Sequence, residues 1–423
     1  MEGRLTGSLQ VSVHCLSPLP QRRTPALLAR IWEMGHGEPI VGRKETVEID
    51  DNGTHGHVIR VPSGFEVVEG VRLDKDYAVG KEIAGGNQGA IYELLDSKRT
   101  PTPQLLKVLK SKRMVPFTGA DIGLKREWLI GQQLNKLKSK DGELHGFMGT
   151  GAALVSDGED GMMEGLILDK VNGMPLNKRM WKDERFANAR YVLEMLRQVF
   201  AALDRANREL GFVHGDMRIA NIMEHRPEME TILPKGFAGK SQLKAQKHAV
   251  RDQMFKLPGD DDHRPLKFKI IDYGHSTISK RRTSQALPKV PFFDKIYHRL
   301  IGHRGDVWRL LQDLSGALDG RTWPEKDMQQ VKMITGLVKE VTGVKLHAWY
   351  RAAEPAPGQK RRKLKRGLPW QRAGGFGHRI RRALIRIQAF IRPRNTKFTP
   401  SEALRYLDTY QAESVNVPAK ALP

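Results

Sequence analysis

The sequence is almost without cysteine, since Cys15 is the only one among 423 residues. One cysteine cannot form an internal disulfide or a cysteine metal cluster, and such scarcity is typical of a reducing compartment. Long apolar runs are missing as well, because no uncharged apolar stretch approaches the ~18 residues that a membrane-spanning helix requires. The sequence therefore predicts a soluble folded protein, cytoplasmic or nuclear, whose 39% hydrophobic residues supply a core.

Acidic residues are also few compared with basic ones. The chain has 71 lysines and arginines against 48 aspartates and glutamates, which gives a formal net charge of +23. The imbalance is largest in residues 355–401, which hold fourteen basic residues and no acidic one. This basic block favours an anionic partner, either an acidic protein, nucleic acid or a membrane surface. A solvated basic face explains the same composition without a partner.

Residues 1–72 lack helical periodicity and are predicted to be an N-terminal extension, with strand-like alternation only over 57–67. No acidic residue lies between Gly3 and Trp32, where arginines stand among serines and threonines. That composition is similar to an organellar transit peptide, so a chloroplast or other organellar location is the alternative to the cytoplasm or nucleus. A disordered basic tail is the simpler interpretation.

From residue 77 the pattern predicts two strands, over 77–83 and 90–95, joined by the small polar turn 84–89. Glycines in this turn, Gly86 and Gly89, would let backbone amides approach phosphate oxygens without a side chain in the way. A purely structural turn would use the same glycines.

Lys107 lies inside an otherwise apolar predicted strand, 104–109. A lysine in such a place is costly unless its charge is paired. The predicted helix 124–134 offers Glu127 on the face that turns inward, so we expect Lys107 to pair with Glu127. Two more strands, over 147–156 and 165–170, precede a Gly/Pro break at 171–175 that is typical of a linker between lobes.

The second half of the chain places oxygen-bearing side chains on loops after buried elements. An apolar helix over 187–210 leads into the loop 211–221, which carries Asp216 and Asn221. Asp216 could accept a proton from a hydroxyl, and Asn221 could ligate a hard cation. A predicted strand over 268–274 then ends with Asp272, a third oxygen-bearing residue.

In this order the motifs resemble the eukaryotic-type protein kinase family, from about Tyr77 to Tyr410. Residues 84–91 resemble the family's glycine loop, 104–107 its Val-Ala-Ile-Lys strand, 214–221 its catalytic loop and 272–274 its Asp-Phe-Gly motif. The resemblance implies an α+β, bilobal kinase-like fold with a small β-rich N-lobe and a larger helical C-lobe. It implies these segments: 73–410 as the kinase-like domain, divided into 73–170 and 171–410, a basic insert at 224–267 and a tail at 411–423.

The same resemblance implies an activity, transfer of the γ-phosphate of ATP to a protein hydroxyl with ATP and Mg²⁺ as cofactors. By position, Asp216 would be the catalytic base, Asn221 and Asp272 the magnesium ligands, and Lys107, held by Glu127, the contact to the α and β phosphates. Arg218 stands where serine/threonine members usually have lysine, so the preference for serine/threonine over tyrosine stays open. The nucleotide would further contact Ile83, Gly85, Gly86, Gly89, Ile91 and, beside the gatekeeper Leu168, the backbone of Asp169 and Val171.

Two C-lobe features extend the resemblance. Asp306 opens a helix like the one whose acid steadies the family's catalytic loop, although it would also serve as a plain helix cap. The segment 398–407 is similar to the family's last helix, with Thr399 and Glu402 spaced as a capping box. The basic amphipathic segment 378–391 would be the preceding helix.

Departures from the family pattern leave alternatives open. Gly215 replaces the arginine before the catalytic acid, which puts activation by a loop phosphate in doubt. The Ala-Pro-Glu motif is not readable; Asp294 would supply its acid and Lys397 its partner. Since a small-molecule kinase of the aminoglycoside or choline type also shows His-Gly-Asp, that activity is one alternative. A pseudokinase scaffold is the other.

Overall fold

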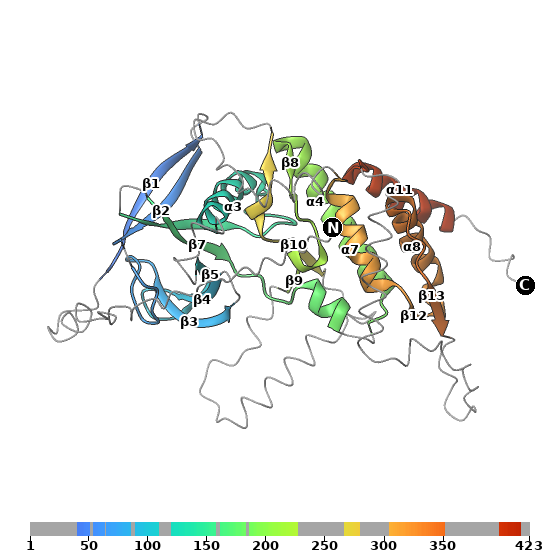
Figure 1. The fold of residues 1–423 in the computed structure, drawn as a ribbon, viewed down its shortest axis with the longest axis horizontal. Coiled ribbons are helices and arrows are strands. Elements are labelled where there is room, and N and C mark those ends of the chain that lie inside the picture. Colours follow the sequence, from blue (N-terminus) through green and yellow to red (C-terminus); the bar gives the residue numbers. More distant parts are fainter. Residues whose placement is uncertain are drawn as a thin grey trace, which may run out of the picture.

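The protein is described here by a computed structural model that covers residues 40–50, 54–63, 65–85, 89–109, 120–157, 161–182, 186–226, 266–279, 304–351 and 397–415. Its architecture is the α+β, bilobal, kinase-like fold that the resemblance implied. A sheet forms the smaller lobe and helices the larger one, with short strands between them (Figure 1).

The sheet has seven strands in the order β1-β2-β6-β7-β5-β4-β3. All neighbours are antiparallel except β2 and β6, which are parallel. Five of the predicted strands, over 77–83, 90–95, 104–109, 147–156 and 165–170, are confirmed within a few residues. The bounds are β1 Arg43–Asp50, β2 Thr54–Val61, β3 Ala78–Gly85, β4 Gly89–Leu95, β5 Pro101–Leu109, β6 Thr150–Ser156 and β7 Met163–Asp169.

The first two strands correct the expectation that residues 1–72 form only an extension. β2 pairs with β6 from Val58↔Ala153 to Val61↔Ser156 and so joins the sheet of the small lobe. Ile59 and Val61 are fully buried in its core. Sequence periodicity indicated a strand near this position but could not show its partner, because β6 lies about ninety residues further along the chain. The predicted boundary at residue 73 therefore cuts through one folded unit.

One helix, α3 (Ala120–Leu134), lies against the sheet (Figure 1). Its apolar side chains Leu124, Trp128 and Leu129 are buried among residues of β6 and β7. Gly131 is required by close packing, because a Cβ there would lie 2.0 Å from the Thr150 hydroxyl. The short helix η2 (Asn135–Leu137) follows directly.

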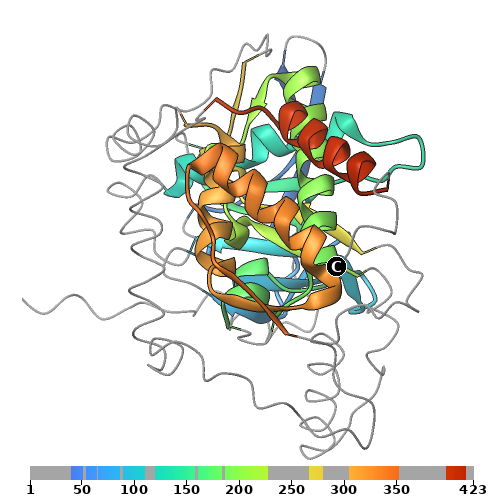
Figure 2. The same cartoon turned by 90° about the vertical axis from the view of Figure 1, so that its right-hand side faces the viewer.

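The larger lobe is built around α4 (Ala189–Leu210), which α8 (Met328–Thr342) and α11 (Pro400–Val415) flank (Figure 2). The Asn188 side chain caps α4 by accepting from the Tyr191 amide at 2.9 Å. Its predicted apolar stripe is buried as expected: Val192, Leu196, Val199, Phe200 and Leu203. The capping box of α11 is confirmed, since Thr399 and Glu402 exchange hydrogen bonds.

Short elements lie between the sheet and the helices, and they carry the polar loops. They are η3 Lys178–Lys182, β8 Phe212–Val213, η4 Ile219–Asn221, β9 Ile222–His225, β10 Lys267–Ile270, η6 Tyr273–His275 and β11 Thr277–Ile278. The larger lobe also contains α7 Asp306–Leu318, β12 Arg321–Pro324, η8 Glu325–Asp327 and β13 Ala348–Arg351.

The predicted basic insert, 224–267, is corrected at both ends because these residues pair as strands. Glu224 in β9 is buried, accepts from Arg179 at 2.5 Å and from the Tyr191 hydroxyl at 2.5 Å. Lys267 pairs with His225 across β9 and β10. Residues 227–265 lie outside the described residues, as do Asp294, the segment 378–391 and all of the basic block up to residue 396.

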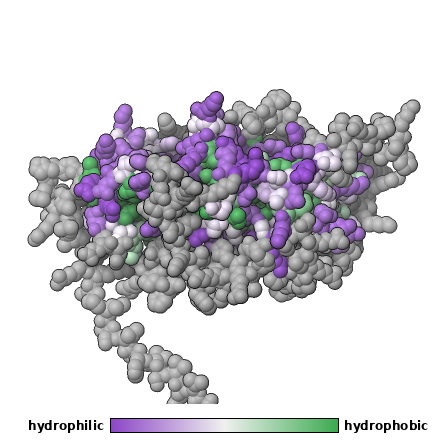
Figure 3. Space-filling model, turned by 90° about the horizontal axis from the view of Figure 1, so that it is seen from above, coloured by the Kyte–Doolittle hydropathy of each residue, from purple (hydrophilic) through white to green (hydrophobic). Residues whose placement is uncertain are grey.

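Hydrophilic side chains predominate on the described part of the face in Figure 3, with small apolar areas between them. Large apolar side chains that are exposed include Ile40, Val68, Ile83 and Trp349, which come from separate elements. None of the helices in the described ranges is long and apolar enough to cross a membrane. The compartment stays a prediction.

Candidate active site

The predicted pair of Lys107 and Glu127 is present. The Lys107 ammonium on β5 donates to the Glu127 carboxylate on α3 at 2.6 Å, and Glu127 is only 2% exposed. Burial opposes the charge of Lys107, but attraction from Glu127 and Asp272 outweighs it and raises the pKa of the ammonium. Burial likewise raises the pKa of Glu127, which the lysine offsets only in part. The lysine is therefore charged and held in place.

Helix α4 delivers the chain to the catalytic-loop segment through two backbone turns. Gly211 ends α4 in the left-handed conformation, with φ of 65°, and β8 follows at once. Gly215 is also left-handed, with φ of 75°, a conformation that L side chains adopt only at a cost. The left-handed backbone at this position therefore favours glycine over residues with a side chain.

Helix α7 holds this loop through acidic side chains on one face. The Asp306 carboxylate accepts from the backbone amides of His214 at 2.7 Å and Gly215 at 2.9 Å. Seven residues further along the helix, Asp313 accepts from the Ile219 amide at 3.1 Å. Asp306 thus does what the resemblance implied, and it is not the N-cap of α7, because Gly305 has that position.

Both oxygens of the Asp216 carboxylate have partners, and the side chain is about 5% exposed. Oδ1 accepts from Arg309 Nη2 at 2.6 Å. Oδ2 accepts from the Asn221 amide at 3.2 Å and lies 3.2 Å from Arg218 Nη2. Of these contacts, those of Oδ2 are the longer ones.

Asn221 and Asp272 are brought together by the pairing of β9 with β10. Ile222 pairs with Ile270, so the residue before one strand lies beside the residues after the other. The Ile271 amide accordingly donates to the Asn221 carbonyl at 3.0 Å. Asp272 lies 3.9 Å from the Lys107 ammonium. Burial opposes the charge of Asp272, but Lys107 outweighs it and keeps the pKa of the carboxyl below its ordinary value.

Asp272 has a left-handed backbone, with φ of 66°, which is uncommon for a residue with a side chain. The next residue, Tyr273, fixes this turn because it is fully buried. Its hydroxyl accepts from the Met148 amide at 2.8 Å and lies 2.8 Å from the Met148 carbonyl and 2.9 Å from the Ile270 carbonyl. Tyr273 thereby anchors the ionised Asp272 to the small lobe.

The side chains around Asn221 and Asp272 fit a hard divalent cation. The Asn221 amide nitrogen donates to the Asp216 carbonyl and carboxylate, which leaves its Oδ1 as a ligand. The Asp272 carboxylate is ionised and 42% exposed, so it is open to a ligand. An amide oxygen and a carboxylate are ligands that suit Mg²⁺.

Several residues that are predicted to contact the nucleotide lie near one another. Ile83, Gly85 and Ile91 lie at the end of the β3–β4 pair that leads into residues 86–88, where Ala84 pairs with Ile91. Gly89 serves packing, because a Cβ there would lie 2.8 Å from the Val108 carbonyl oxygen. Gly86 lies outside the described residues.

The hinge between the lobes begins at Asp169, the last residue of β7 and next to the buried Leu168. The Asp169 amide donates to the Gly149 carbonyl at 2.9 Å, so it is already used within the protein. The Val171 carbonyl accepts from the Gly173 amide at 3.1 Å.

Sequence reasoning missed Arg309, Asp313 and Arg126. Arg309 and Asp313 follow Asp306 at helical spacings of three and seven, so the signal was a polar stripe on an otherwise apolar helix. Arg126 of α3 donates to the Ser276 carbonyl at 2.7 Å and ties the helix to the segment after Asp272. It precedes Glu127, and no pattern distinguished it from a surface arginine.

No family model matches the chain, and no curated protein is significantly similar to it. Among solved structures, it is similar to a double mutant of the Mycobacterium tuberculosis PknI kinase domain, with 17% identity and a TM-score of 0.36, over 65% of this chain and 90% of that one. It is also similar to titin kinase with its flanking domains, with 13% identity and a TM-score of 0.38, over 82% of this chain. The chain spans about half, 49%, of that titin structure. Values this low carry no argument about activity.

Proposed function

We propose that this protein is an ATP-dependent protein kinase that transfers the γ-phosphate of ATP to a serine or threonine hydroxyl of a protein substrate. The observation that supports it most is the convergence of four separate segments. A lysine paired with a buried glutamate, an ionised aspartate, an asparagine and a second aspartate meet where the two lobes join. Phosphoryl transfer needs this combination, because catalysis depends on positioning and charge neutralisation.

Each side chain has a role that its surroundings permit. Lys107 is charged and would contact the α and β phosphates, with Glu127 fixing its position. Asn221 and Asp272 would hold Mg²⁺, which neutralises phosphate charge when it is bound. Asp216 Oδ2 would accept the proton of the substrate hydroxyl while that oxygen attacks the γ-phosphorus and the bond to ADP breaks.

Arg218 extends from the same loop and has a side chain that is 49% exposed, 3.2 Å from the Asp216 carboxylate. A cation there would meet the transferred phosphoryl group. We assign it this role because Arg309 already holds the other oxygen of Asp216 and is buried away from solvent.

Activity can be tested with purified full-length protein, Mg²⁺ and labelled ATP, offered with a protein mixture or with a panel of aminoglycosides and choline. We expect label on serine or threonine of proteins and none on the small alcohols. Label on the small alcohols alone would replace the proposal by a small-molecule kinase. Nucleotide binding without transfer to either would favour a pseudokinase scaffold.

The assignment of Asp216 is tested by Asp216→Asn, which keeps the shape but cannot accept a proton. We expect phosphate transfer to fall by about 10²–10⁴-fold, because the substitution removes the proton acceptor. Nucleotide affinity should stay nearly unchanged, because no contact to the phosphates is removed. The matched control is Asp204→Asn, at a helix position outside the site. Transfer at the parental rate in Asp216→Asn would refute the role.

A further inference from the structure

A cavity of about 540 Å³ lies where residues 169–171 meet β9 and β10. It is lined by the hinge residues 169–171, by the loop that follows η2, and by β9 and β10. Lys107, Asp216 and Asp272 are not among its lining residues, whereas Asp169 and Val171, two of the predicted nucleotide contacts, are. Its volume lies in the range of small-molecule pockets in proteins.

The cavity has an excess of positive charge. Lysines outnumber acids in its lining by four to two: Lys138, Lys170, Lys267 and Lys269 against Glu143 and Asp169. They come from separate parts of the chain, the loop after η2, the hinge and β10. Because lysines in one partly enclosed space repel one another, this arrangement favours a bound anion.

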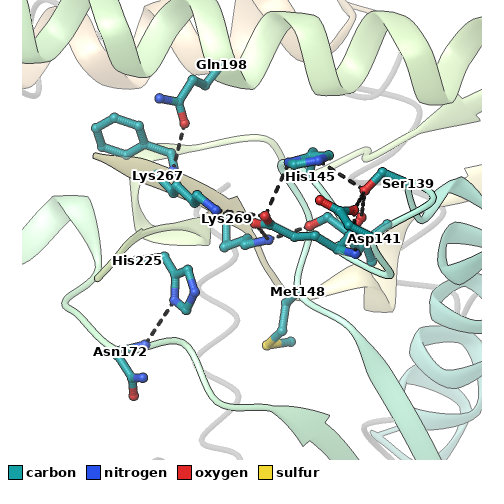
Figure 4. Close-up of polar contacts among 12 residues, drawn as sticks. Ser139, Asp141, His145, Met148, Asn172, Gln198, His225, Lys267 and Lys269 are labelled. Atoms are coloured by element: carbon teal, nitrogen blue, oxygen red, sulfur yellow. Dashed lines mark hydrogen bonds and ion pairs between the residues drawn. The ribbon is translucent and has the colours of Figure 1, made fainter. Parts of the chain in front are cut away.

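Two of the lysines share a single carboxylate (Figure 4). Lys267 and Lys269 are two residues apart on β10 and so point to the same face. Lys267 donates to both Glu143 oxygens, at 2.7 and 2.9 Å, while Lys269 lies 3.6 Å from Oε1. The single Glu143 carboxylate therefore faces two ammonium groups.

Lys269 is the most buried of the four lysines, since its side chain is only 9% exposed. Its ammonium donates to the Leu144 carbonyl, which satisfies one of its three donors. Burial lowers the pKa of Lys269, and Lys267 beside it acts in the same direction. An anion in the cavity would offset both effects.

The imidazole of His225 also lines the cavity, near the hinge. The Asn172 amide lies 3.3 Å from His225 Nδ1, so that nitrogen is the acceptor and the proton of the neutral ring is on Nε2. Lys170 and Val171 also line the cavity, and Val171 is expected at the nucleotide.

A metal ion is a poorer fit to the same place. Asp141, Glu143 and His145 lie close enough together to hold a cation. Glu143, however, is already engaged by Lys267 and Lys269, and an added cation would be repelled by both ammonium groups.

We propose that this cavity, between the hinge and β10, binds a small polyanion that carries two or more phosphate groups. A single phosphate is much smaller than the cavity, whereas linked phosphates could reach from Lys267 and Lys269 to Lys170 and Lys138. Each ammonium–phosphate contact is a charge-assisted hydrogen bond, which is stronger than a neutral one. The site is independent of phosphoryl transfer, so its test needs no enzymatic activity.

Binding is measured by calorimetric titration of the full chain with tripolyphosphate in the absence of Mg²⁺. We expect saturable binding with one site, weakened at high potassium chloride because salt screens the charges. The same titration of Lys107→Met separates the two sites. Unchanged affinity in that variant supports the cavity, and loss of binding would move the tripolyphosphate to the candidate active site and overturn the proposal.

Two variants of the cavity should act in opposite directions. Lys170→Gln with Lys267→Gln removes two half-buried cations and should weaken binding by about tenfold or more. Glu143→Gln removes the carboxylate that competes with the ligand and should strengthen binding by about threefold to tenfold. A purely structural role of these ion pairs would not produce opposite signs.

The matched control is Lys332→Gln with Lys339→Gln, two exposed lysines of α8 far along the chain, which removes the same charge. Affinity equal to the parent is expected in this variant. An equal loss in the control and cavity variants would show general attraction to a basic protein and refute the site. Thermal unfolding of each variant confirms that it is folded before binding is compared.

Discussion

Arg309 and Asp216 form an ion pair of 2.6 Å between side chains that are 9% and 5% exposed. The same guanidinium donates to the Gly215 carbonyl at 2.5 Å, so it grips both the backbone and the side chain of the loop. Burying two charges is costly, and such pairs contribute more to geometry than to stability. Arg309 therefore fixes Asp216, the proposed base, in a loop that has Gly215 directly before it.

Arg309→Met should slow phosphoryl transfer by about 10- to 100-fold while nucleotide affinity stays near the parental value. The reason is that Asp216 loses the partner that orients it, and a small displacement of a catalytic group lowers the reaction rate strongly. Arg309→Lys should recover only part of the rate, because lysine cannot make both contacts in one plane. Steady-state kinetics separate kcat from KM.

Stability must be followed in the same variants, since removing one partner of a buried pair costs about 3–5 kcal/mol. The double variant Arg309→Met with Asp216→Asn removes both charges and should regain most of this loss. If the single variant keeps the full rate, Arg309 has no part in positioning the base.

Lys107→Met should reduce transfer by at least about 10²-fold, because one fixed cation at the phosphates is lost. The matched variant is Glu127→Gln, which keeps the lysine but removes the charge that holds it. We expect a smaller loss of rate in Glu127→Gln and a raised KM for ATP in both. Equal rates in all three proteins would show that the pair has only a structural role.

Tyr273→Phe should destabilise the protein by about 1–2 kcal/mol, because the hydroxyl that contacts Met148 and Ile270 is lost inside the core. Urea unfolding measures this loss. The ring packing against Phe147 and Phe212 is retained, so folding itself should survive. We further expect slower transfer, since Asp272 would be less firmly held. A variant as stable as the parent would mean that these hydrogen bonds contribute nothing net.

Stability should fall at alkaline pH through two buried tyrosines. Burial raises the pKa of Tyr191 and of Tyr273 well above 10.0. A raised pKa means that the tyrosine in the folded state keeps its proton to a higher pH than in the unfolded state. The stability that each buried neutral tyrosine contributes is therefore fully present below the unfolded pKa of about 10, and it is lost as the pH rises above that value. Above pH ~10, each of the two tyrosines should lower the free energy of unfolding by about 1.4 kcal/mol per pH unit, up to its pKa in the folded state.

Urea unfolding at stepped pH values checks this expectation. Tyr273→Phe, which carries no ionisable group, should show a shallower fall than the parent above pH ~10. Phenolate absorbance offers a second readout, because two tyrosines should ionise only when the protein unfolds. A slope identical in parent and variant would contradict the assignment.

The sequence predicted well whatever depended on local pattern. The strand that carries Lys107, the helix with Glu127 and the capping box at Thr399 lie where periodicity and capping chemistry placed them. The strand predicted over 268–274 is present only as β10, which ends at Ile270, two residues before Asp272. These signals are local, because period, cap and turn residues are read from a few neighbouring positions. The motif order then indicated which side chains should converge.

Contacts between distant segments could not be predicted in the same way. Nothing in residues 43–61 reveals that β2 pairs with β6, since only the folded chain brings them together. Arg309 looked like one charged residue on a helix, and its partner lies ninety-three positions earlier. The cationic cavity is likewise assembled from separate parts of the chain, none of which is a motif.

The β1–β2 pair decides how the protein can be shortened for study. A version that starts at residue 73 would retain every side chain proposed for catalysis, yet the unpaired main-chain groups of β6 would become a free strand edge. Exposed edges recruit other chains, so that version would precipitate or self-associate. Its inactivity would then reflect a missing neighbour in the sheet and would say nothing about the chemistry of the cleft.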